Sequence, residues 1–146
     1  NKYIKLINFL ICNSEQKLIL TGTDKDILLS ESIIKNLNSP KIYDLTGKTS
    51  ILELIEIIRK ASFVISNDSS SVHIAYALRT KSICISSGNN FNRFVPYPKT
   101  LQSKYKPYTF FSKGCLKDDW QCAKFHRCID QVDVLDIEKY IKLKIL

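Results

Sequence analysis

Apolar positions follow two different rhythms from the N-terminus to about residue 86. Residues 3–11 carry apolar side chains at i, i+3, i+4 and i+7 spacing, which predicts a helix. Short apolar runs between such stretches predict buried strands. Ser50 and Glu53 have the spacing of a capping box at a helix start. The two patterns predict helices at 3–11, 24–37, 50–59 and 72–78, and strands at 17–20, 42–45, 62–66 and 81–86.

Helices and short strands therefore alternate along this part of the chain. The alternation is typical of a parallel sheet with helices on both faces, a Rossmann-like α/β fold. Such sheets bind ligands beyond the carboxyl ends of their strands. Three turns leave those ends, at 21–26, 45–50 and 66–71. We expect the three turns to build one pocket.

The C-terminal third is less regular. Residues 88–98 are rich in turn formers and aromatic residues and are predicted to form a loop. Residues 99–131 are predicted to be irregular, and 134–145 to form a closing helix capped by Asp133. The sequence thus predicts a core at 1–98, with an irregular Cys-containing tail and closing helix at 99–146 in the same domain.

The net charge of +8 limits the kinds of partner. Lys and Arg number 22 against 14 Asp and Glu, which is compatible with nucleic acid, an anionic membrane surface or phosphorylated small molecules. The lysines are scattered rather than clustered, so a solvated surface explains them equally well and no nucleic-acid partner is predicted. No apolar run is long enough to span a membrane. The chain begins at Asn1 and contains no Met, so we expect a fragment or a processed product.

The strongest chemical signal lies at residues 66–78. An apolar strand is followed by small hydroxyl residues and Asp68, the composition of a capped helix start. A helix N-terminus directs unpaired N–H groups and partial positive charge outward, so this turn predicts an anion site suited to the diphosphate of a nucleotide. Asp68 either caps the helix or contacts a ligand hydroxyl. His73 is either a phosphate donor or structural, and both side chains are expected at an exposed mouth.

Gly47, Lys48 and Thr49 look like the end of a P-loop. A P-loop also needs a glycine five positions before Gly47, where this chain has Ile42. The sequence therefore excludes a P-loop.

The five cysteines fall into two groups. Cys12 and Cys84 lie in apolar segments and are predicted to be inert core residues. The odd total argues against a disulfide framework. The second group has donors for zinc, but its spacing fits no common zinc motif, so no metal is predicted. Its members are Cys115, Cys122, Cys128 and His126.

Several segments together resemble glycosyltransferase family 9, the heptosyltransferase-like family of lipopolysaccharide assembly. The matching segments, in order, are 44–54, 67–75, Arg93 with Phe94, and Pro96 with Tyr97. The similarity covers about residues 1–98. The family has the GT-B fold, two Rossmann-like domains of which the second mainly holds the nucleotide-sugar donor. The resemblance is to that second domain, with the acceptor domain absent and the catalytic base, whose identity stays unknown here, expected in that absent domain.

The resemblance also implies which residues bind the donor. Asp68, Ser69 and Ser70 correspond to contacts with the sugar and diphosphate, and His73 to a histidine at the start of the same helix. Ser70 departs from the glycine that is common in the family, which favours a donor other than a heptose. The remaining implied contacts are Lys48 and Thr49 near the base and ribose, Gly22 and Asp24 facing the ribose, and Arg93 beside the diphosphate.

The resemblance implies an inverting glycosyltransferase that uses a nucleotide diphosphate sugar and a glycolipid or oligosaccharide acceptor, with no cofactor. The fragment alone is expected to bind the donor without turnover. We expect a cytoplasmic location, with peripheral contact at the inner face of the membrane. Two alternatives stay open: a non-catalytic nucleotide-binding interaction module, and a nucleic-acid binder suggested by charge alone.

Overall fold

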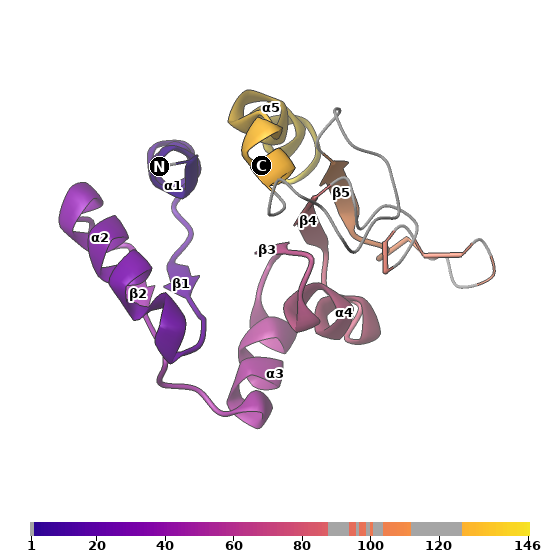
Figure 1. Cartoon of the computed structure of the whole chain (residues 1–146), viewed down its shortest axis with the longest axis horizontal. Helices are drawn as coiled ribbons and strands as arrows, with labels where there is room; N and C mark the ends of the chain where they lie inside the picture. Colours follow the sequence, from indigo (N-terminus) through magenta and orange to yellow (C-terminus); the bar gives the residue numbers. More distant parts are fainter. Residues whose placement is uncertain (1, 88–93, 96, 99, 101–103, 112–126) are drawn as a thin grey trace. The chain divides into compact units, whose positions relative to one another are not determined.

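A computed structural model describes residues 2–87, 94–95, 97–98, 100, 104–111 and 127–146 (Figure 1). The chain divides into two compact units. The first unit is Asn1–Leu54 together with Val134–Leu146, and the second unit is Ile55–Asp133.

The first unit contains a two-stranded parallel sheet and helices. Its elements are α1 (Lys2–Asn13), β1 (Leu18–Leu20), the 3-10 helix η1 (Asp24–Asp26), α2 (Ile27–Leu37), β2 (Ile42–Asp44) and α5 (Val134–Lys144). Leu18 of β1 lies opposite Ile42 of β2, and Leu20 lies opposite Asp44. Because β1 and β2 run parallel, the turns that follow them leave the same edge of this sheet.

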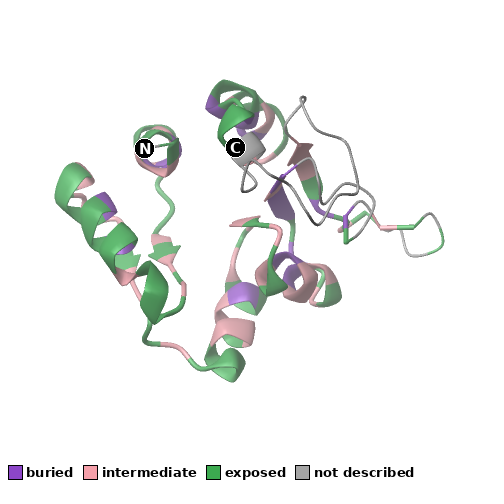
Figure 2. Cartoon of the chain, viewed as in Figure 1, coloured by how far each residue is buried: buried purple, intermediate pink, exposed green. Residues whose placement is uncertain are grey.

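Helix α1 packs against α2 and α5. The buried faces of these helices are visible in purple in Figure 2. They consist of Leu6, Ile7 and Leu10 of α1, Ser30 and Ile33 of α2, and Val134, Ile137 and Ile141 of α5. Cys12 is exposed, so the prediction of a core cysteine there is wrong. At about 100° per residue, position 12 lies roughly 200° around α1 from Leu10 and thus away from the buried face.

The described residues of the second unit contain a three-stranded parallel sheet. Its strands are β3 (Val64–Asn67), β4 (Ser82–Ser86) and β5 (Tyr108–Phe111), with β4 in the middle. Helix α4 (Ser70–Ala77) packs on β3 and β4. The buried centre consists of Val72, Cys84 and Val95, with Phe111 packed against it.

Helix α3 (Ile51–Lys60) begins in the first unit and ends in the second. Its predicted capping box is confirmed. The N–H and the hydroxyl of Ser50 donate to Glu53 Oε2 at 2.8 and 2.7 Å, and the Glu53 N–H donates to Ser50 Oγ at 3.4 Å. The hydrogen bonds from the Ser50 backbone and side chain lower the pKa of Glu53.

The α/β class and the parallel strand pairing are confirmed, and the strands that the structure describes form two sheets, one in each unit. Every helix and strand predicted before residue 87 is present, with ends shifted by a few residues. The prediction that 99–131 is irregular is wrong at β5 and at the 3-10 helix η4 (Arg127–Gln131). Aromatic and β-branched residues favour strands, and the sequence of β5 is Tyr-Thr-Phe-Phe. No helix of the described part of the chain is long and apolar enough to cross a membrane.

Lys41 links the end of α1 to the residues before β2. Its ammonium donates to the carbonyl oxygens of Ile11 and Ser14 at 3.1 and 2.8 Å. These carbonyls belong to the last turn of α1 and its exit, where a cation also interacts favourably with the helix dipole. Lys41 also lies 3.4 Å from the exposed Glu15 carboxylate.

We predict that Lys41→Met destabilises the protein by about 1–2 kcal/mol, because two carbonyls lose a charged donor. Urea unfolding measures the change. Lys25→Met, at an exposed lysine of the same unit, is the control and should change stability by less than about 0.5 kcal/mol. Equal effects of the two substitutions would contradict the capping role of Lys41.

Candidate functional site

Two of the three predicted turns lie side by side in the first unit. The Gly47 N–H donates to the Gly22 carbonyl oxygen at 3.0 Å, and the Leu45 N–H donates to the Leu20 carbonyl at 2.9 Å. The turns at 21–26 and 45–50 are therefore in contact with each other. The third turn belongs to the second unit, so a single pocket built from all three stays a prediction.

The turn after β1 is closed by a capping box. The N–H and the hydroxyl of Thr23 both donate to Asp26 Oδ2 at 2.8 Å. The hydrogen bond from the Thr23 side chain has the larger effect, and together with the one from the Thr23 backbone it lowers the pKa of Asp26. A Cβ on Gly22 would lie 2.9 Å from the Asp26 side chain, so the box leaves room only for glycine there. Asp24, the predicted ribose contact, is exposed at the start of η1.

The turn after β2 is held by Asp44. Its carboxylate accepts hydrogen bonds from the Thr46 N–H at 3.0 Å and from the Ser30 hydroxyl at 3.2 Å. Burial acts to raise the pKa of Asp44, but hydrogen bonds from Thr46 and Ser30 and the charge of Lys48 outweigh it, and the pKa is lowered. Lys48 is exposed, and its ammonium donates to the Asp44 carbonyl at 3.2 Å. Thr49 beside it is half-buried.

In the second unit, the turn after β3 leads directly into α4. Ser69 is the N-cap residue, with extended backbone angles of φ −141° and ψ 175° and no side-chain hydrogen bond to the helix. Its hydroxyl instead lies 2.9 Å from the Ser66 hydroxyl. Asp68 therefore precedes the cap, and the alternative that Asp68 caps the helix is wrong. Ser69 and Ser70 are exposed at the helix start.

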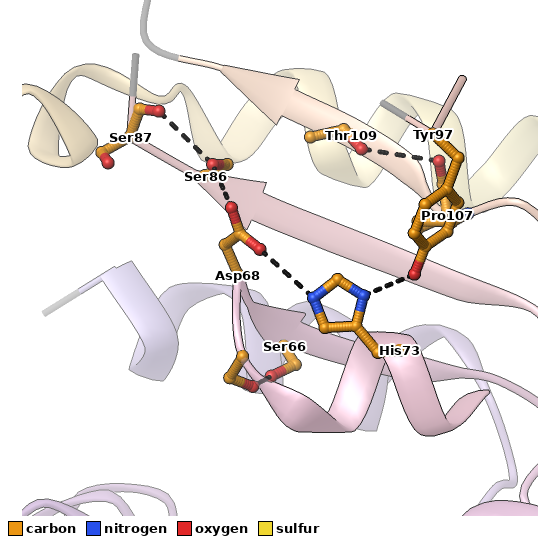
Figure 3. Close-up of polar contacts among 9 residues, drawn as sticks. Ser66, Asp68, His73, Ser86, Ser87, Tyr97, Pro107 and Thr109 are labelled. Carbon is orange, nitrogen blue, oxygen red and sulfur yellow. Dashed lines mark hydrogen bonds and ion pairs between the residues drawn. The ribbon is translucent and has the colours of Figure 1, made fainter. Parts of the chain in front are cut away.

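The Asp68 side chain is only 5% exposed, so it is more buried than the sequence suggests. Asp68 Oδ2 accepts a hydrogen bond of 3.0 Å from the hydroxyl of Ser86, a fully buried residue of β4 (Figure 3). The Asp68 N–H donates to the Ile85 carbonyl at 3.2 Å. The prediction of an exposed carboxylate is thus wrong. The C-terminal end of β4 therefore fixes the position of the Asp68 side chain.

His73 lies between Asp68 and Tyr97 (Figure 3). Its Nε2 is 3.9 Å from Asp68 Oδ1, and its Nδ1 shares a hydrogen bond of 2.5 Å with the Tyr97 hydroxyl. The Tyr97 ring packs on Tyr76 with centroids 4.4 Å apart. The His73 side chain is 38% exposed. It is therefore fixed on one side by Tyr97 and open to solvent over part of its surface.

Burial also acts on two neighbouring groups. It raises the pKa of Tyr97 to about 12, with smaller contributions from Tyr76, Cys84 and Asp68. It likewise raises the pKa of the buried Cys84 thiol to about 12, with Asp68 adding to the effect. Cys84 is thus a protonated core residue at neutral pH, as its apolar surroundings in the sequence predicted.

Some predicted residues lie outside the described part of the chain. Arg93, Cys115, Cys122 and His126 are among them, and so is the side chain of Cys128. Within the described residues, no group of three or more His, Cys, Asp or Glu side chains is arranged to hold a metal ion.

Ser86 contacts Asp68, and Tyr97 contacts His73, but the sequence-based hypothesis gives neither Ser86 nor Tyr97 a role. Ser86 ends β4, so the rule that ligands lie beyond strand ends gives a signal for it. Tyr97 follows Pro96 in a segment that resembles the family, but nothing in the sequence connects it with His73.

The arrangement around α4 has a definite chemical capacity. The start of an eight-residue helix offers backbone N–H groups and partial positive charge. Exposed hydroxyls of Ser69 and Ser70 and the accessible edge of His73 lie on this same short segment. Asp68 adds a fixed carboxylate beside them. This set suits a ligand that combines an anionic group with hydroxyl groups.

Comparison with known proteins gives two matches. The family model for glycosyltransferase family 9 (heptosyltransferase) matches residues 1–120. The solved structure of E. coli ADP-heptose lps heptosyltransferase II is similar, with a TM-score of 0.69 and 17% identity. This match covers 97% of the chain and 40% of that structure, so the chain spans about two fifths of its length. The similarity confirms the GT-B class of fold. No curated protein sequence matches the chain.

Gly47 provides a test of the contact between the two turns of the first unit. Its φ is +70°, and a Cβ there would lie 2.7 Å from Asp24 Oδ1. We predict that Gly47→Ala destabilises the protein by about 1–2 kcal/mol from the left-handed backbone alone, and by more because of the clash. Urea unfolding measures the loss. In an Asp24→Ala background the same substitution should cost less, and an equal cost in both backgrounds would contradict the close approach.

Proposed function

Because the chain belongs to glycosyltransferase family 9 (heptosyltransferase), we propose that it is the donor-binding domain of an inverting glycosyltransferase. Its donor is a nucleotide diphosphate sugar. Its acceptor is a glycolipid or oligosaccharide of a lipopolysaccharide or another surface glycan. The base that deprotonates the acceptor hydroxyl belongs to the acceptor domain, so this fragment binds the donor without turnover.

The observation that carries the proposal is the placement of Asp68 and His73 at the start of α4. A helix start binds phosphate oxygens through its N–H groups and its dipole. His73 lies in the first turn of α4 with a partly exposed ring, so it is placed to add a donor to the same anion. Ser69 and Ser70 supply hydroxyls at that point. The diphosphate of the donor is therefore assigned to this helix start.

Asp68 is assigned to the sugar. Asp68 Oδ2 accepts the hydrogen bond from the Ser86 hydroxyl, while Oδ1 lies 3.9 Å from His73 Nε2. A carboxylate with few degrees of freedom selects hydroxyl groups by position, because a misplaced hydroxyl leaves a buried charge poorly solvated. Asp68 is thus suited to orient a sugar ring rather than to shuttle protons.

The turns of the first unit are assigned to the nucleoside. Gly22 and Asp24 are proposed to face the ribose, and Lys48 and Thr49 the base and ribose. Arg93 is proposed to balance the charge of the diphosphate. The hydrogen bond between Gly47 and Gly22 supports a common role for these two turns.

In the proposed reaction, the acceptor oxygen forms a bond to the anomeric carbon while the bond to the nucleoside diphosphate breaks. The leaving group gains negative charge, and donors already aimed at it lower the barrier. The N–H groups of α4 and His73 supply that stabilisation, so no metal ion is required by the proposal. Peripheral contact with an anionic membrane surface remains a proposal based on the net charge of +8.

We predict that Asp68→Asn and His73→Gln each weaken binding of ADP or UDP, or of the corresponding nucleotide sugar, in the full-length enzyme. Loss of a charge-assisted hydrogen bond costs about 1.5–3 kcal/mol, or about ten- to a hundredfold in affinity. We expect the larger effect of His73→Gln on the nucleotide and of Asp68→Asn on the nucleotide sugar. Calorimetric titration measures both.

Glu56→Gln is the matched control, because Glu56 is an exposed residue of α3 whose carboxylate pairs with Arg59 of the same helix at 3.1 Å. It should leave nucleotide affinity unchanged. Thermal melting of each variant separates binding from folding. Normal nucleotide and nucleotide-sugar affinity in both site variants would overturn the assignment, and binding without sugar transfer by the full-length protein would favour the non-catalytic alternative.

A further inference from the structure

Tyr97 is the contact of His73 that the proposed function does not use. The two residues are 24 positions apart in sequence, and the Tyr97 hydroxyl lies 2.5 Å from His73 Nδ1 (Figure 3). The Tyr97 ring is packed on Tyr76 at 4.4 Å and on the His73 ring at 5.7 Å. Because packing fixes the ring, the direction of the hydroxyl toward Nδ1 is fixed as well.

The Tyr97 hydroxyl is protonated at neutral pH. Burial raises the pKa of Tyr97 to about 12. A protonated hydroxyl donates readily to an unprotonated ring nitrogen, and a neutral histidine has one unprotonated nitrogen and one N–H. If Tyr97 donates to Nδ1, the hydrogen of His73 must be on Nε2.

The other neutral form of His73 is disfavoured by its second neighbour. With the hydrogen on Nδ1, the lone pair of Nε2 would face Asp68 Oδ1 at 3.9 Å, and Ser86 already holds the other oxygen of that carboxylate. The two acceptors would repel each other. With the hydrogen on Nε2, an N–H dipole faces the carboxylate. Tyr97 and Asp68 therefore favour the same form.

We propose that Tyr97 is a positioning residue that holds His73 in the Nε2–H form, so that this N–H donates to a phosphate oxygen of a nucleoside diphosphate. A separation of 3.9 Å from Asp68 is longer than a hydrogen bond, so Nε2–H keeps its capacity to donate to a ligand. A bare Nε2 in that place would repel the same oxygen. The assignment of a nucleoside diphosphate rests on the proposed function, whereas the choice of ring nitrogen does not.

Nuclear magnetic resonance tests the choice of nitrogen without any ligand. The full-length enzyme is labelled with ¹⁵N-histidine, and His73→Gln assigns the signals of His73. Long-range ¹H–¹⁵N spectra at about pH 8, above the usual histidine pKa, distinguish a protonated from a bare ring nitrogen. We expect Nε2–H alone in the wild type. In Tyr97→Phe, where only Asp68 still favours Nε2–H, we expect a measurable share of Nδ1–H beside it. Tyr76→Phe, which removes a hydroxyl from the same aromatic stack, should keep the wild-type spectrum.

The same variants are then titrated with ADP and with UDP. Affinity should fall roughly three- to tenfold in Tyr97→Phe and stay unchanged in Tyr76→Phe. A wild-type spectrum with Nδ1–H, with both forms or with both nitrogens protonated overturns the proposal, and it does so even if Tyr97→Phe fails to fold. An altered spectrum with unchanged affinity removes the role in binding. If no protein binds either nucleotide but the spectra behave as expected, the proposed function fails and the role of Tyr97 in fixing His73 stands.

Discussion

A carboxylate withdrawn from water needs hydrogen-bond donors, and the side chain of Asp68 imposes this requirement on the second unit. The hydroxyl of Ser86 meets it from the neighbouring strand. Ser86 is available there because β3 and β4 pair in parallel, with Asn67 opposite Ile85. A shift of this register by one residue would place a different side chain beneath the turn. The register of two core strands thus determines where the carboxylate points, and its position determines what faces His73.

The resulting turn is a fixed arrangement of polar groups on a short helix. Val72 and Ala75 of α4 are fully buried, which anchors the helix whose N-terminus carries the exposed serines. His73 lies between these anchors, with Tyr97 behind one ring nitrogen and Asp68 beside the other. A site that stabilises charge developing on a leaving group needs hydrogen-bond donors that are partly exposed to the ligand and held by a rigidly packed helix.

The sequence predicted those features that depend on neighbours within a few residues. Apolar spacing identified the helices and strands up to residue 86, and Ser50 with Glu53 formed the expected capping box. The contact of the turns at Gly22 and Gly47 followed from parallel strand pairing. The resemblance to the family rested on residues in the same local segments, and the match over residues 1–120 confirms it.

The features it missed depend on contacts between distant residues. Nothing near Asp68 in sequence indicates that Ser86 will donate a hydrogen bond to it. Tyr97 contacts His73 although the two residues are 24 positions apart in sequence. The prediction for Cys12 is wrong because apolar neighbours alone do not show which face of α1 a residue occupies. Strand β5 had a local signal in its aromatic residues, but the polar residues around it concealed the strand.

The proposed function depends on binding of a nucleotide diphosphate at the start of α4. Amide chemical shifts of the full-length enzyme, followed during titration with ADP and UDP, test it most directly. We predict that the amides of residues 69–71 and the side chain of His73 shift most, because N–H groups that donate to phosphate change their environment strongly. Saturable binding that leaves residues 66–73 unchanged and shifts amides elsewhere would contradict it.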